Sequence, residues 1–188
     1  MQRVMICGGP GSGKSTLARI MSERTGLPVY HMDHFHWKPG WIERTSEEKI
    51  PLIRAVQARD AWIFEGGNSS TFAERAARAD TMIWLDLPVT LRLFRVIWRT
   101  IRDQGKVRPD MAPDCPEGFH HETWRFWKYI WATRHTAWLK SKAIAENTPH
   151  LTVHHLQTRS QVAAFIANLP QNKEASHDPR PTRHRRPE

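Results

Sequence analysis

The amino-acid sequence predicts an α/β protein of three layers, in which a five-stranded parallel sheet lies between two layers of helices. Two observations lead to this fold class. Five short apolar runs alternate along the chain with longer stretches of helical periodicity, as βαβ units require. The apolar runs are continuous rather than alternating with polar residues, which indicates strands that are covered on both faces of the sheet.

The five predicted strands are short apolar runs with turn-forming or polar residues at their ends. The first, "RVMIC", ends in a glycine-rich turn, and "PVYHM" and "AWIF" are each followed by an acidic residue. "TMIWL" and "LTVHHL" complete the set. In chain order, we expect strands at 3–7, 28–32, 61–64, 81–85 and 151–156.

Capping and stop signals define the predicted helices. A helix over 14–25 ends because Gly26 follows it. Thr45 and Glu48 have the spacing of a capping box, so a second helix begins there and runs to about Arg59. In the second half we expect a basic amphipathic helix at 91–102, a long helix at about 120–146 and a closing helix at 160–169.

The length of 188 residues suits one domain with a short appendage, which we place at 1–170 and 171–188. The appendage is polar, Pro-rich and basic, so we expect a disordered tail. Cys7 and Cys115 are the only cysteines and form no disulfide framework or zinc pattern, and Cys7 suits a small core residue. No apolar stretch is long enough for a signal peptide or a membrane span, so we expect a cytoplasmic protein.

The formal net charge of +9 is concentrated in one part of the chain. The segment Arg92–Lys142 contains eleven basic and five acidic side chains. Such an excess favours a polyanionic ligand, either a nucleoside triphosphate or a nucleic acid.

A phosphate-binding loop lies between the first strand and the first helix. Gly8, Gly13, Lys14 and Ser15 match the P-loop pattern GxxxxGK[ST], and the position between strand and helix is the one that the pattern requires. Lys14 reaches the β- and γ-phosphates, and the Ser15 hydroxyl binds Mg²⁺. We therefore expect ATP or GTP with Mg²⁺, held by Gly8, Gly9, Pro10, Gly11, Ser12, Gly13, Lys14, Ser15 and Thr16.

Two carboxylates follow neighbouring strands and so face the same crevice as the P-loop. Asp33 can accept a substrate hydroxyl proton or hold a Mg²⁺-bound water, with a turn or helix cap as the alternative. Glu65 can orient Mg²⁺ through water, with a simple turn as the alternative. Which of the two is the main catalytic carboxylate stays open. The expected contacts of the acceptor are Asp33, Lys38, Trp41 and Asn68.

Three histidines alternate along the segment after the second strand, and they are His31, His34 and His36. They form only a weak metal-binding pattern, so a solvent- or substrate-facing role suits His34 and His36 better.

Four arginines form one stripe on the predicted helix at 91–102. Arg92, Arg95, Arg99 and Arg102 are spaced 3, 4 and 3 apart, with no acidic partner before Asp103. We expect phosphates in the crevice to relieve their repulsion, although a solvated basic face is the alternative.

The segment at about 103–120 is rich in proline and is the expected lid that keeps water from the γ-phosphate. The long helix after it carries tryptophans with helical spacing. They predict a core stripe, with an aromatic ligand platform as the alternative, and are Trp124, Trp127, Trp131 and Trp138.

These motifs resemble the nucleoside-monophosphate-kinase branch of P-loop proteins, to which adenylate kinase belongs. "GGPGSGKST" is similar to the adenylate-kinase loop, and Glu65-Gly66 stands where that family has Asp-Gly. "LDLP", followed by Arg95 and Arg99, resembles the family's fourth-strand motif and lid-hinge arginines. The resemblance implies that Arg95 and Arg99 contact the ATP base and phosphates.

A closer resemblance, over about residues 1–168, is to bacterial adenylate-kinase-like proteins labelled DNA-topology-modulation proteins. It rests on three segments in the same order: "LPVYHMDHFHWKPGW", "WIFEGGNSSTFAERAARADTMIWLDLP" and "KVRPDMAPDCPE". Glu65 stands where that family more often has Asp. The arginine that follows Asp-Gly in adenylate kinases is absent, so we do not expect adenylate kinase activity itself.

The sequence therefore leads to two hypotheses. The first is an ATP-dependent kinase of a nucleotide, nucleoside or other small hydroxyl compound, with Lys14, Asp33, Arg95 and Arg99 as catalytic residues. The second is a nucleic-acid-associated ATPase or switch that affects DNA topology, which the sequence favours less because it contains no recognised nucleic-acid-binding motif.

Overall fold

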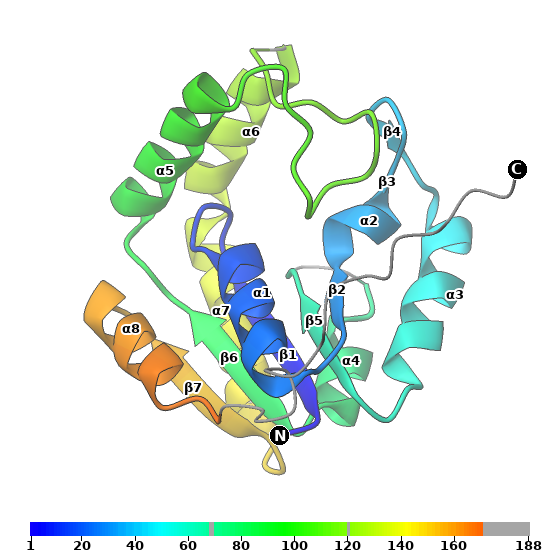
Figure 1. The fold of residues 1–188 in the computed structure, drawn as a ribbon, viewed down its shortest axis with the longest axis vertical. Helices are drawn as coiled ribbons and strands as arrows, with labels where there is room; N and C mark the ends of the chain where they lie inside the picture. The colour runs from blue at the N-terminus through cyan, green and yellow to red at the C-terminus, as the bar shows by residue number, and fades with distance from the viewer. Residues whose placement is uncertain (68–69, 120, 171–188) are drawn as a thin grey trace, which may run out of the picture.

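A computed structural model describes residues 1–67, 70–119 and 121–170, and within it the five predicted strands form one parallel sheet (Figure 1). The strand order is β2-β5-β1-β6-β7. The predicted α/β class is confirmed, and the first strand lies at the centre of the sheet. The strands are β1 (Arg3–Gly8), β2 (Val29–His31), β5 (Trp62–Glu65), β6 (Thr81–Leu85) and β7 (Thr152–Leu156).

Helices cover both faces of this sheet, which makes the three predicted layers. Val4 and Ile6 of β1 point to one face, where they join the helix that follows the phosphate loop and the last helix. Met5 and Cys7 point to the other face. Burial raises the pKa of the Cys7 thiol to about 12, so Cys7 is the inert core residue that we expected.

The two helices that the sequence predicts in the first half of the chain begin at the expected residues. α1 (Lys14–Thr25) matches the predicted range, and α3 (Ser46–Gln57) begins after Thr45, whose side chain forms the expected capping box with Glu48. Three short features escaped prediction. They are α2 (Met32–His36), the hairpin of β3 (Trp37–Lys38) with β4 (Ile42–Glu43), and α4 (Phe72–Arg78).

In the second half, α5 (Val89–Arg102) and α8 (Arg159–Ala167) agree with prediction, but the single long helix does not. It is divided into α6 (His121–Ala132) and α7 (Arg134–Asn147). The residue between them, Thr133, donates its hydroxyl proton to the Tyr129 carbonyl oxygen over 2.7 Å. Such back-bonding by a β-branched residue favours a bend. The proposed tail at 171–188 lies outside the described residues.

The loop between α5 and α6 extends toward α2 and the β3–β4 hairpin across the carboxyl end of the sheet (Figure 1). It is the segment expected as a lid. No helix of the described residues is both long and apolar enough to cross a membrane.

Candidate active site

The turn between β1 and α1 is a cradle of backbone groups. Gly8, Gly11 and Gly13 have φ angles of 141°, 77° and 95°, which favour glycine strongly. Gly13 is the N-cap of α1, and none of the described side chains caps it. The first N–H groups of α1 and the positive end of its dipole are therefore available to an anion.

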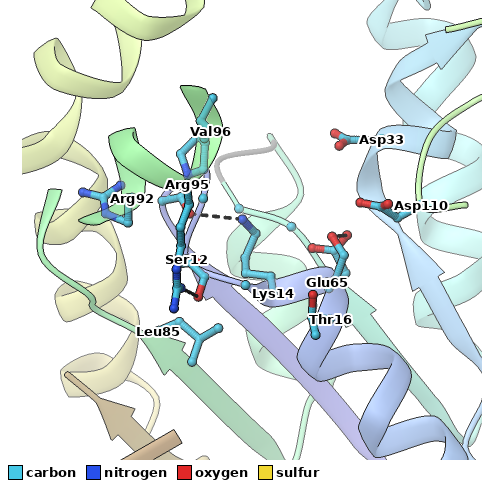
Figure 2. Close-up of a pocket in the computed structure, with 18 of the residues that line it drawn as sticks. Ser12, Lys14, Thr16, Asp33, Glu65, Leu85, Arg92, Arg95, Val96 and Asp110 are labelled. Carbon is cyan, nitrogen blue, oxygen red and sulfur yellow. Dashed lines mark hydrogen bonds between the residues drawn. The ribbon is translucent and has the colours of Figure 1, made fainter. Parts of the chain in front are cut away.

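This cradle borders a cleft of about 1600 Å³ at the carboxyl end of the sheet. α5 closes one side of the cleft, and α2 and the α5–α6 loop lie on the opposite side (Figure 2). The arrangement places a phosphate-sized cradle at the base of a cleft large enough for two small molecules.

Lys14 and Ser15 lie where the phosphate-loop pattern places them. The Lys14 ammonium donates to the Gly9 carbonyl oxygen over 3.3 Å, across the cradle (Figure 2). The Ser15 hydroxyl donates to Glu65 Oε1 over 3.1 Å. His31 Nδ1 lies 2.9 Å from the same oxygen.

The strand register explains why these groups meet. Glu65 pairs with Ile6 of β1 on one side and with His31 of β2 on the other. Burial raises the pKa of Glu65, but the His31 hydrogen bond and the Lys14 charge outweigh this, and the net pKa lies below the usual value. Glu65 is therefore ionised beside Ser15, and the two oxygens are the kind that Mg²⁺ prefers.

Asp33 occupies the first turn of α2, across the cleft from Lys14 (Figure 2). Burial and the nearby Glu65 charge raise the pKa of Asp33, and Lys14 and Arg108 offset this only in part. A carboxylate with a raised pKa is better suited to accept a proton near neutral pH than an ordinary one.

The four arginines of α5 have four different environments, so the stripe is not a uniform phosphate-facing surface. Arg92 is 8% exposed and donates from Nε to the Leu87 carbonyl oxygen over 3.0 Å. Its guanidinium packs so closely that a Cβ at Gly9 would lie 1.7 Å from Nη1. Arg92 therefore supports the cradle from behind.

The other three arginines lie further along α5. Arg95 Nη1 is 3.5 Å from the Ser12 carbonyl oxygen, at the edge of the cradle (Figure 2). Arg102 is largely exposed and pairs with Asp103 over 2.7 Å. Arg99 forms a 3.0 Å ion pair with Glu117, an acidic partner from the α5–α6 loop that sequence spacing could not reveal.

The α5–α6 loop also brings charged residues that were missed as site residues. Arg108 lies 2.7 Å from the Glu117 carboxylate and 2.6 Å from Asp110. Burial raises the pKa of Asp110, but Arg108 and the Ser15 hydroxyl outweigh this, and the net pKa is lowered. Asp110 thus lies near Ser15 as a carboxylate. It is on the same side of the cleft as Asp33 (Figure 2). Its only sequence signal was membership of a Pro-rich loop.

The expected acceptor residues are only partly brought together. Trp41 borders the cleft with Asp33. Lys38 is not among the described residues that line the cleft, and its ammonium group pairs with the Glu48 carboxylate over 2.5 Å. The expectation that Lys38 faces an acceptor is therefore corrected. Asn68 lies outside the described residues.

The tryptophan stripe is not a core stripe. Trp124 and Trp131 are 62% and 48% exposed, and Trp138, at 36%, donates from Nε1 to Asp86 over 3.0 Å. The expectation of a core stripe is wrong because α6 does not pack against the sheet. Ile130 is the one buried side chain among those described in α6. Trp138 borders the cleft.

Comparison with known proteins supports the fold. No protein-family model matches the chain. A cytidylate kinase from Methanoregula boonei is 26% identical over 110 residues, which are 52% of this chain and 60% of that protein, so the match spans less than two thirds of the relative.

Solved structures show the fold. Shikimate kinase from Acinetobacter baumannii, in complex with shikimate, has a TM-score of 0.54 at 15% identity and covers 89% of both chains. Shikimate kinase from Bacteroides thetaiotaomicron has a TM-score of 0.50 at 19% identity and covers 89% of this chain and 95% of its own. The chain therefore has the fold of P-loop kinases. These relatives do not bear on DNA topology, so that part of the resemblance stays a prediction.

Proposed function

We propose that this protein is an ATP-dependent phosphotransferase that moves the γ-phosphoryl group to a small acceptor: a nucleotide, a nucleoside or another hydroxyl compound. The observation that carries the proposal is Asp33, a half-buried carboxylate with a raised pKa that lies across the cleft from an open phosphate cradle. A carboxylate across the cleft from the cradle is where a phosphotransferase needs a base for the acceptor hydroxyl.

The donor side fits ATP and Mg²⁺. The positive φ angles of the cradle and the uncapped N-terminus of α1 suit a triphosphate, and a Cβ at Gly11 would lie 2.3 Å from the Arg92 carbonyl oxygen. Ser15 would hold Mg²⁺ directly and Glu65 through water. When bound, Mg²⁺ would neutralise negative charge on the phosphate oxygens during the transfer.

Within the described residues, no cluster of three His, Cys, Asp or Glu side chains could hold a metal ion by itself. This agrees with Mg²⁺, which keeps waters and takes substrate phosphate oxygens among its ligands.

In the proposed reaction an acceptor oxygen forms a bond to the γ-phosphorus while the bond to the β–γ bridging oxygen breaks. Asp33 takes the proton from the acceptor hydroxyl, and ADP leaves. Lys14, Arg95 and Arg99 balance the charge on the transferred group. The α5–α6 loop acts as the lid that excludes water.

The acceptor side is defined by Asp33 and by the indole of Trp41. Lys38 is engaged with Glu48, so we leave it out of the proposed acceptor set. An aromatic wall and a carboxylate fit a ring-bearing molecule with a free hydroxyl.

The test is ADP release from Mg-ATP, measured with a panel of nucleotides, nucleosides and sugar-like hydroxyl compounds. We expect one class of acceptor to stimulate turnover and Lys14→Ala to abolish it. Asp33→Asn should lose the acceptor-dependent rate but still bind ATP, whereas Asp60→Asn, on an exposed turn, serves as the matched control. Turnover stimulated by DNA or RNA alone would refute the proposal.

A further inference from the structure

The β3–β4 hairpin and the α5–α6 loop share a small hydrophobic core of their own. Met111, Ala112 and Cys115 of the loop are 7%, 3% and 0% exposed, and Trp37 and Trp41 of the hairpin pack against them. The two indole rings meet edge to face with centroids 5.3 Å apart. This core is separate from the two that cover the sheet.

Hydrogen bonds join the same two segments. Trp41 donates from its backbone N–H to Cys115 Sγ over 3.3 Å and from Nε1 to the Pro116 carbonyl oxygen over 3.3 Å. The Gly40 N–H donates to the Asp114 carbonyl oxygen over 3.1 Å. Cys115 Sγ in turn donates to the Lys38 carbonyl oxygen over 3.5 Å.

Backbone strain is stored at this junction. Trp41 and Asp114 have φ angles of 62° and 53°, and they are the two non-glycine residues with positive φ in the described part of the chain. A bulky residue holds such a conformation only where its surroundings stabilise it. Here the surroundings of each residue include the other segment.

Both segments border the cleft on the side of α2, but they reach different groups of the site. The loop projects Arg108 and Asp110 toward Arg99 and Ser15, which belong to the phosphate side of the site. The hairpin carries Trp41 on the side of Asp33, where we place the acceptor. A rigid connection between them links the two halves of the site.

We propose that Trp41 is a positioning residue that makes the loop and the hairpin move as one cap, so that nucleotide binding in the cradle also orders the acceptor wall. This rests on the proposed function, because it requires a nucleotide in the cradle. If the loop and the hairpin moved independently, nucleotide binding would reduce the backbone mobility of the loop and would not change that of the hairpin. Acceptor and nucleotide thus bind cooperatively through the cap.

Hydrogen–deuterium exchange of the full chain tests this without knowledge of the acceptor. Exchange is followed in peptides covering 8–16, 37–43 and 105–118, with and without Mg²⁺ and the non-hydrolysable β,γ-imido analogue of ATP. In the wild-type protein we expect the analogue to slow exchange in all three segments, by roughly tenfold in the loop and the hairpin.

Trp41→Ala should keep the slowing at 8–16 and 105–118 and lose it at 37–43. Ile42→Ala, one residue along the hairpin and 59% exposed, is the matched control and should behave as wild type. Cys115→Ala removes the sulfur contacts from the loop side and should weaken the hairpin response as well. Unchanged exchange in β1 and β6 peptides shows that each variant is folded.

The outcomes separate this proposal from the proposed function. Slowing at 8–16 without any change at 37–43 in the wild-type protein would overturn the single cap but leave ATP binding intact. An undiminished hairpin response in Trp41→Ala would also overturn it. No slowing at 8–16 would overturn the proposed function and the cap together.

Discussion

Replacement of Gly11 by alanine measures how closely α5 approaches the phosphate cradle. A Cβ at this position would lie 2.3 Å from the Arg92 carbonyl oxygen and 2.9 Å from Val96 Cγ2. The first of these atoms belongs to the backbone of α5, so the clash cannot be relieved by rotating a side chain. Either the helix or the cradle must move.

The chain contains its own controls. Gly40 and Gly105 have φ angles of 77° and 76°, against 77° for Gly11, and a Cβ at either would meet no described atom within 4 Å. Strain from the left-handed backbone is thus the same at all three positions, about 1–2 kcal/mol. Overpacking at Gly11 adds about 1–3 kcal/mol. We therefore expect Gly11→Ala to lower the free energy of unfolding by about 2–5 kcal/mol in total.

The assay is urea unfolding followed by tryptophan fluorescence, with Gly40→Ala and Gly105→Ala measured in parallel. Gly11→Ala should also weaken ATP-analogue binding, because the displaced helix carries Arg95 at the edge of the cradle. Equal losses of stability in the three variants would refute the close approach of α5 and leave backbone strain as the whole effect.

Three further outcomes are expected. A base acts only when it is deprotonated, and the pKa of Asp33 is raised. On acidification, kcat/KM should therefore begin to fall at a pH above the ordinary pKa range of aspartate. A fall of kcat/KM only within that ordinary range would exclude Asp33 as the base. Arg99→Ala should lower kcat by roughly a thousandfold with little change in nucleotide affinity, and an equal loss in both would assign Arg99 to ground-state binding. Arg75 is fully buried and donates to the Gly66 carbonyl oxygen over 2.7 Å, so Arg75→Met should lower the free energy of unfolding by about 1–3 kcal/mol in thermal or urea unfolding. Arg54→Met, at an exposed ion pair, should have little effect. Similar losses of stability in the two variants would contradict the role of burial.

The sequence predicted the elements whose signals are local. The bounds of α1 and β6 agree with the predicted ranges, and Thr45 with Glu48 marked the start of α3. Caps, stop signals and apolar runs act over a few residues, so one sequence suffices to find them. The phosphate loop belongs to the same category.

The features that were missed depend on contacts between distant segments. β3 and β4 contain two residues each, too few for a strand pattern, and they are held by the α5–α6 loop about seventy residues later in the chain. The partnership of Arg99 with Glu117 likewise joins a helix to a loop. The tryptophans of α6 showed helical spacing, but spacing cannot tell a buried face of a helix from an exposed one.

The placement of Glu65 has a consequence for how this chain tolerates length variation. Glu65 is the last residue of β5, and its position beside Ser15 follows from its pairing with Ile6 and His31. Side chains alternate between the faces of a strand, so one residue inserted within 62–65 would turn Glu65 away and bring Phe64 or a neighbour to the cradle. Insertions in the surface turns at 58–60 or 148–150 leave that pairing intact. Homologous chains with this site can therefore differ in the lengths of those turns, while the number of residues in β5 stays constant.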